Sequence, residues 1–113
     1  MRALIVLALL DLAACHRGGR DEGLARAVMA ANCAGCHVIP GVARAVGRVG
    51  PELEHIGRQQ LIGGRLPTSR ANLAYWLGHA QDVDPGGAMP NIALTDRQAF
   101  AAADYLLSTD NYR

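Results

Sequence analysis

Residues 33–37, Cys33-Ala34-Gly35-Cys36-His37, decide how the rest of this 113-residue sequence is interpreted. Two cysteines three positions apart lie on one side of a helical turn, so their sulfurs can reach two neighbouring groups of one ligand. The histidine that follows can point its imidazole at a metal held by that ligand. C-x-x-C-H is the attachment signature of c-type haem, so the sequence predicts one covalently bound haem c. Cys33 and Cys36 would hold its vinyl groups and His37 would bind its iron.

Two other uses of the cysteine pair fit less well. A thioredoxin-like dithiol would lie beside a βαβ pattern, which this sequence lacks. A structural zinc ion needs four ligands, and His16, His55 and His79 form no second closely spaced pair.

Composition also favours a buried cofactor. Half of the residues are hydrophobic, but only five are aromatic: one Trp, three Tyr and one Phe. Long stretches rich in Gly and Pro separate the candidate helices, and loops this long in a small domain need something to wrap around. The net charge of +1 gives no support for binding nucleic acid.

Hydrophobic periodicity predicts an all-α chain with helices over about 21–34, 69–80 and 96–107. Thr68 or Ser69 can cap the second helix, and Thr95 with Gln98 forms a capping box for the third. A short helical turn is expected over 52–56, and no segment alternates as a strand. The expected inner faces are Leu24, Ala27, Val28 and Ala31; Leu73, Trp76, Leu77 and Ala80; and Ala99, Ala103, Leu106 and Leu107.

The first fourteen residues, MRALIVLALLDLAA, resemble an export signal and are too short to span a bilayer. Leu12-Ala13-Ala14-Cys15 resembles a bacterial lipoprotein box, in which cleavage precedes a cysteine that then carries lipid. We therefore expect a cleaved signal peptide over 1–14, a tether over 15–21 anchored through lipid on Cys15, and one domain over 22–113. Ordinary signal cleavage, with Cys15 removed or left as a free thiol, is the alternative.

The best candidate for the second axial ligand of the iron is Met89. It lies in the Pro- and Gly-rich stretch Asp84 to Pro90, a rigid loop that can bring a thioether to a fixed point. Met29 lies on a predicted helix and is expected to pack in the core. His55 and His79 are the competing ligands.

Four motifs in order, CAGCH (33–37), GPELEHIGR (50–58), LPTSRANLAYWL (66–77) and DPGGAMPN (84–91), carry a family resemblance. The chain resembles class I monohaem cytochromes c over about residues 22–107, closest to bacterial domains associated with haem-copper oxidases. The resemblance implies the cytochrome c fold, with three main helices and long loops wrapped around one haem. It also implies that the Pro51 carbonyl accepts a hydrogen bond from the His37 ring and that Arg58 pairs with a haem propionate. Trp76 and Leu77 would line the haem pocket near Met89.

The resemblance further implies that the first and third helices cross, with Gly23 and Ala27 facing Tyr105 or Leu106. Two features depart from the family. Ala80 stands where a Pro is common, which predicts a looser end of the second helix. The ring of Lys residues around the haem edge of mitochondrial homologues is missing, because the chain contains no Lys.

These observations predict an electron-transfer protein rather than an enzyme, since His37 and Met89 would fill both axial positions of the iron. It would carry single electrons in a bacterial respiratory chain, from a quinol-oxidising complex or dehydrogenase to a terminal oxidase. The expected location is the periplasm or the outer face of the membrane. The alternatives are a five-coordinate haem protein with peroxidase or gas-sensing activity, and a fixed electron-entry subunit of a larger enzyme.

Overall fold

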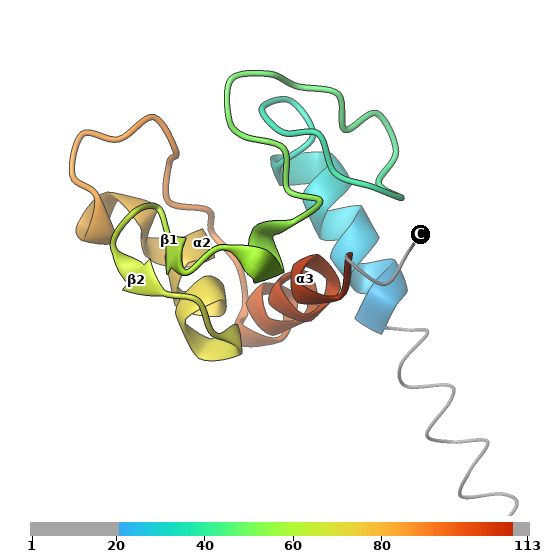
Figure 1. Cartoon of the computed structure of the whole chain (residues 1–113). Coiled ribbons are helices and arrows are strands. Elements are labelled where there is room, and N and C mark those ends of the chain that lie inside the picture. The colour runs from blue at the N-terminus through green and yellow to red at the C-terminus, as the bar shows by residue number, and fades with distance from the viewer. Residues whose placement is uncertain (1–20, 110–113) are drawn as a thin grey trace, which may run out of the picture.

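The computed structural model describes residues 21–109 (Figure 1). A helix over residues 21–32 comes first and is followed by a long loop. The remaining elements are η1 (Ile56–Arg58), β1 (Leu61–Ile62), β2 (Leu66–Pro67), α2 (Arg70–Val83) and α3 (Asp96–Ser108). The three predicted helices are confirmed, and no end differs by more than three residues. The expected signal peptide, the tether and Cys15 lie outside the described residues.

The predicted caps explain where α2 and α3 begin. The Ser69 hydroxyl accepts a hydrogen bond from the Asn72 amide at 3.0 Å, so Ser69 rather than Thr68 is the cap of α2. The capping box of α3 is complete, with Thr95 and Gln98 each accepting a bond from the other's backbone amide. These side chains satisfy amides that the first turn of a helix leaves without partners.

The expectation that the chain holds no strand is wrong in one place. β1 and β2 form a small antiparallel hairpin, with Ile62 opposite Leu66. Gly63 and Gly64 make its turn at φ +58° and +71°, values that glycine adopts without strain. Strands of two residues are too short to produce visible alternation. The expected helical turn over 52–56 is also displaced, to Ile56–Arg58.

The predicted inner face of the first helix is confirmed at Leu24 and Val28, but it is wrong at Ala27 and Ala31, which are exposed. Its buried residues are Ala25, Val28 and Met29, whereas Ala27 is exposed. Gly23 is exposed too, and a Cβ at Gly23 would meet only open space. Ala residues lie on several sides of this helix, so hydrophobicity alone left its orientation poorly defined.

The predicted contact of Gly23 and Ala27 with the third helix is therefore replaced by other residues. The Arg26 guanidinium lies 5.6 Å from the centre of the Tyr105 ring, and Asp21 pairs with Arg97 at 3.0 Å. These contacts join the first helix to α3, and the hydrophobic cluster continues between them through Ala25 and Met29.

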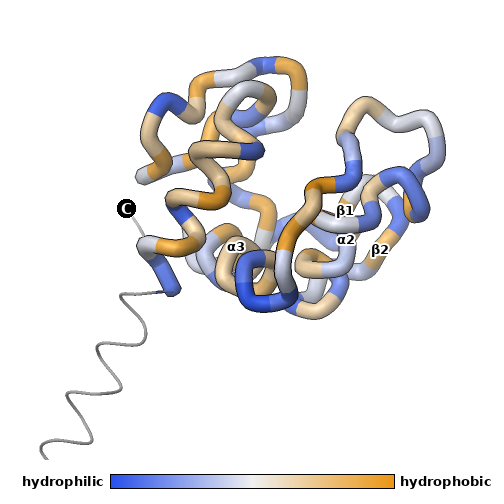
Figure 2. Tube along the Cα trace, turned by 180° about the vertical axis from the view of Figure 1, so that it is seen from behind, coloured by the Kyte–Doolittle hydropathy of each residue, from blue (hydrophilic) through white to orange (hydrophobic). Residues whose placement is uncertain are grey.

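The elements leave their apolar sides facing a common interior. Figure 1 shows the first helix and its following loop on one side, α2 and the hairpin on the other, and α3 beside both. In Figure 2 hydrophobic and hydrophilic residues alternate along the first helix, as expected for an element with one buried face. No helix within the described residues is long and apolar enough to cross a membrane.

Candidate functional site

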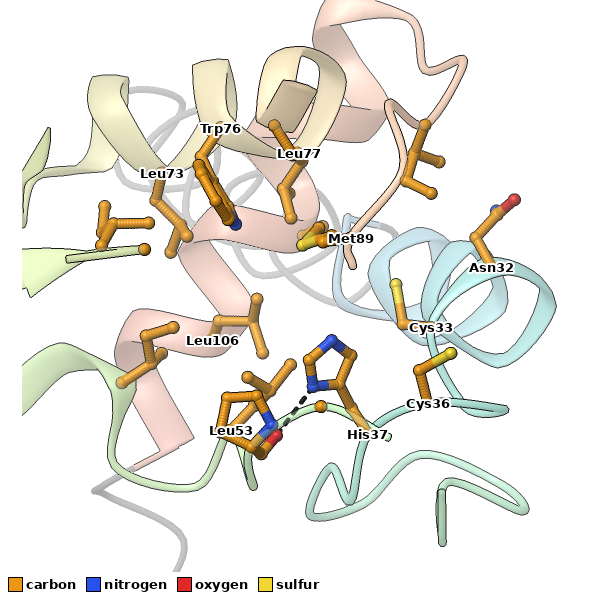
Figure 3. A pocket seen from close by; sticks show the side chains of 18 of the residues that line it. Asn32, Cys33, Cys36, His37, Leu53, Leu73, Trp76, Leu77, Met89 and Leu106 are labelled. Carbon is orange, nitrogen blue, oxygen red and sulfur yellow. Dashed lines mark hydrogen bonds between the residues drawn. The ribbon is translucent and has the colours of Figure 1, made fainter. Parts of the chain in front are cut away.

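A cavity of about 310 Å³ lies between these elements. Residues from the first helix, the following loop, α2, the loop after α2 and α3 line it, and most of them are apolar. Its volume is within the range of roughly 300–1,000 Å³ that is typical of cofactor and ligand sites. The polar and sulfur-bearing groups are few, and they converge from two sides (Figure 3).

The Cys33–His37 segment forms a tight turn at the end of the first helix. The amides of Cys36 and His37 both donate to the Cys33 carbonyl, at 3.1 and 3.0 Å. Both cysteines line the cavity as free thiols, and Figure 3 shows their sulfurs at one edge of it. Burial raises the pKa of the Cys33 thiol, and the neighbouring Cys36 adds to this rise. The turn thus places two thiols together, as the spacing predicted.

The His37 ring is fixed from behind. Its Nδ1 lies 2.7 Å from the Pro51 carbonyl oxygen, which can only accept, so Nδ1 carries the proton. Nε2 then has a free lone pair for a metal, and a hydrogen bond of this kind sets both tautomer and ring orientation. The predicted contact with Pro51 is therefore present.

Gly50 allows the ring to take this position. A Cβ built on Gly50 would lie 2.7 Å from His37 Nδ1 and 2.9 Å from Nε2, closer than real side chains approach. The sequence interpretation missed this role, although Gly50 directly precedes Pro51 in the quoted motif.

Met89 lies across the cavity from His37. In Figure 3 its side chain enters from the loop after α2, above the His37 ring in this view. Met89 is half-buried and packs against the hydrophobic core. The cavity thus has an imidazole on one side, a thioether on the other and two thiols at its edge.

α2 supplies one side of the apolar wall. The predicted inner face, Leu73, Trp76, Leu77 and Ala80, lines the cavity in full. The Trp76 ring packs so closely against the hairpin turn that a Cβ built on Gly63 would lie 2.5 Å from the outer edge of the ring.

The family comparison agrees with this set of groups. Residues 23–110 match the family model described as cytochrome c. The chain belongs to the cytochrome c family. No curated protein matches the sequence. The family binds covalently attached haem c and uses it for electron transfer, so the predictions of fold class and cofactor are confirmed.

The residues of this cytochrome c domain fit that cofactor. Two thiols for the vinyl groups, an imidazole freed at Nε2 and an apolar cavity are the groups that haem c requires. Residues 21–109 contain no group of three or more His, Cys, Asp or Glu side chains that could hold another metal ion.

Three other candidate residues, Arg58, His55 and His79, are not among the residues that line the cavity. Arg58 is exposed in η1, one residue before Gln59, which does line the cavity. Its pairing with a propionate stays a prediction. His79 stacks on Tyr75 with ring centres 4.2 Å apart, and neither His79 nor His55 is among the lining residues. Met29 does line the cavity, and it is fully buried in the core, as expected for packing.

Proposed function

We propose that this cytochrome c is a one-electron carrier whose iron has His37 and Met89 as its two axial ligands. The observation that supports this is the placement of their side chains on opposite sides of one apolar cavity. When bound there, haem c supplies reversible one-electron chemistry. A soft thioether opposite an imidazole favours the reduced metal and raises the reduction potential. Filling both axial positions leaves no site for a substrate.

The first test is the sulfur-to-iron charge-transfer band in the near-infrared spectrum of the oxidised holoprotein, made in cells that mature c-type haem. We expect the band in the wild type and its complete loss in Met89→Ala, because Ala offers no ligand. Met29→Leu is the matched control, since it alters a buried methionine outside the proposed ligand set and should keep the band. An absent wild-type band together with ready CO uptake by the reduced protein would favour the peroxidase or gas-sensing alternative.

We further propose that the carrier works in a bacterial respiratory chain and delivers electrons to a terminal oxidase, from a quinol-oxidising complex or a dehydrogenase. The support is the resemblance of the four motifs to oxidase-associated domains. Reduced protein should be reoxidised by membranes that contain haem-copper oxidases, and failure of this reaction would refute the assignment. Co-purification with a large enzyme would instead indicate a fixed electron-entry subunit.

The proposed location is the periplasm or the outer membrane face, with lipid on Cys15 as the anchor. The support is the apolar leader followed by Leu12-Ala13-Ala14-Cys15. Stable anchoring requires more than one acyl chain, so the mature protein should show a large added mass. An intact mass equal to that of the unmodified mature chain with haem would exclude lipidation.

A further inference from the structure

Near its end, α2 leaves backbone groups without their helical partners on the side that faces the Met89 loop. His79 leaves helical geometry, with φ −135° and ψ 28°. In a regular helix the Gln81 amide would donate to the Leu77 carbonyl. Here the Leu77 carbonyl accepts from the Ile92 amide at 3.1 Å, and the Gln81 amide donates to Asn91 Oδ1 at 2.8 Å. The kink thus frees the Leu77 carbonyl and the Gln81 backbone amide to form hydrogen bonds with the end of the loop.

The Gln81 side chain holds the middle of the same loop. Its Nε2 donates to the carbonyls of Gly87 and Met89, both at 2.7 Å. Its Oε1 accepts from the Gly86 amide at 3.2 Å. One half-buried amide therefore uses both of its donor hydrogens and its acceptor on three backbone groups of the loop.

The amide chemistry of Gln81 suits this position. Two carbonyls need two donors, and one backbone amide needs an acceptor, on opposite ends of one planar group. A carboxylate has no donor and a thioether has neither strong donor nor strong acceptor, so Glu and Met cannot make the same set of bonds. Because Nε2 bonds the carbonyl of Met89 itself, a change at Gln81 acts directly on the backbone that carries the thioether.

We infer that Gln81 is a positioning residue that keeps the Met89 sulfur at the iron, and that its loss opens the sixth coordination position. This inference rests on the proposed ligation by Met89. Without the amide, the loop keeps only its ends on α2, and Met89 leaves the iron more often. An added ligand then binds more tightly, since apparent affinity rises with the fraction of protein in the open state.

The experiment measures imidazole binding to the oxidised holoproteins, together with the charge-transfer band. Losing the three side-chain hydrogen bonds in Gln81→Met should raise the apparent affinity for imidazole roughly tenfold or more. Gln81→Glu, at a pH where the carboxylate is ionised, should raise it at least as much, because the carboxylate faces two carbonyls. If Gln81 only filled space, Glu would behave like the wild type.

Gln98→Met is the matched control. Gln98 also bonds backbone through its side chain, but at the start of α3, with Thr95 as its only bonded partner among the described residues. We expect this variant to lower the free energy of unfolding without changing imidazole affinity. Asn91→Ala removes only the acceptor of the Gln81 backbone amide, at the end of the loop. It should give a smaller rise in imidazole affinity, roughly threefold to tenfold. If Gln81→Met yields no holoprotein, Gln81→Glu, which keeps the length of the side chain and an acceptor for the Gly86 amide, decides the question.

The outcomes separate this inference from the proposed function. A wild-type band together with imidazole affinities within twofold of wild type in Gln81→Met, or in Gln81→Glu where Gln81→Met does not form, would overturn the role of Gln81 alone. An absent wild-type band would overturn the ligation by Met89 and this inference with it.

Discussion

The two sides of the cavity hold His37 and Met89, the proposed iron ligands, in different ways. On one side, His37 follows directly from the turn that carries both cysteines, and the Gly50 amide bonds the Cys36 carbonyl at 2.7 Å. Backbone hydrogen bonds fix this side, and the two thiols would add covalent links to the haem. On the other side, Met89 lies on a loop whose middle is bonded to α2 by a single side-chain amide.

This difference suggests a division of tasks. The His37 side attaches the cofactor, and no change short of losing the thiols or the ring should release it. The Met89 side depends on weak tertiary hydrogen bonds, each contributing about 1 kcal/mol. It is therefore the side on which the proposed ligand can dissociate and free a coordination position of the iron. The reduction potential and the access of small ligands should therefore vary mainly with residues around α2 and its following loop.

The largest expected effect comes from removing the covalent links. Cys33→Ser combined with Cys36→Ser should abolish covalent attachment, because a hydroxyl does not replace a thiolate in forming the thioether. Haem staining after denaturing electrophoresis measures this directly. Cys15→Ser is the control and should keep its haem stain. Haem that survived the double substitution would mean that the His37 side does not attach the cofactor.

A smaller effect is expected when the His37 ring is crowded but the thiols remain. In Gly50→Ala the new methyl group would overlap the ring and push it away from the Pro51 carbonyl. Overpacking of this kind costs about 1–3 kcal/mol, which urea unfolding of the holoprotein can measure.

Gly35→Ala is the matched control, since a Cβ there meets nothing within 4 Å although Gly35 lies between the two cysteines. We expect a change within about 0.5 kcal/mol for this exposed site. Equal destabilisation by both substitutions would mean that the contact with the ring is unimportant.

The same two sides differ in how much the sequence revealed. Cys33, Cys36 and His37 are neighbours in the chain, so local spacing was enough to predict where their side chains meet. Met89 could be proposed because its Pro- and Gly-rich loop is unusual. Gln81 could not, because its role depends on a kink at His79, whereas the sequence predicted only a looser end of α2 from Ala80.

The helices show the same limit. Caps at Ser69 and Thr95 are local devices, and they located the starts of α2 and α3 correctly. The orientation of the first helix depends instead on tertiary packing. Its Ala residues at several angles left that orientation open, and the choice of Gly23 and Ala27 as contacts was wrong.

The smallest expected effect concerns the start of the Met89 loop. Arg65 in the hairpin turn pairs with Asp84 at 3.4 Å, and the two side chains are 60% and 36% exposed. Exposed ion pairs contribute about 0–1 kcal/mol and weaken as salt screens them. Arg65→Ala should therefore change imidazole affinity by less than about threefold at low salt, and by less still at 0.5 M salt.

This small effect decides what holds the loop. Arg65 and Gln81 reach the same segment, one through charge at its first residue and the other through hydrogen bonds at its middle. If Arg65→Ala raised the imidazole affinity as much as Gln81→Met, and salt raised that of the wild type equally, the loop would be held by electrostatic attraction. We expect the opposite. Substitution of Gln81 removes three hydrogen bonds of a half-buried amide at once. Substitution of Arg65 leaves Asp84 exposed, and water can replace the lost partner at little cost in free energy.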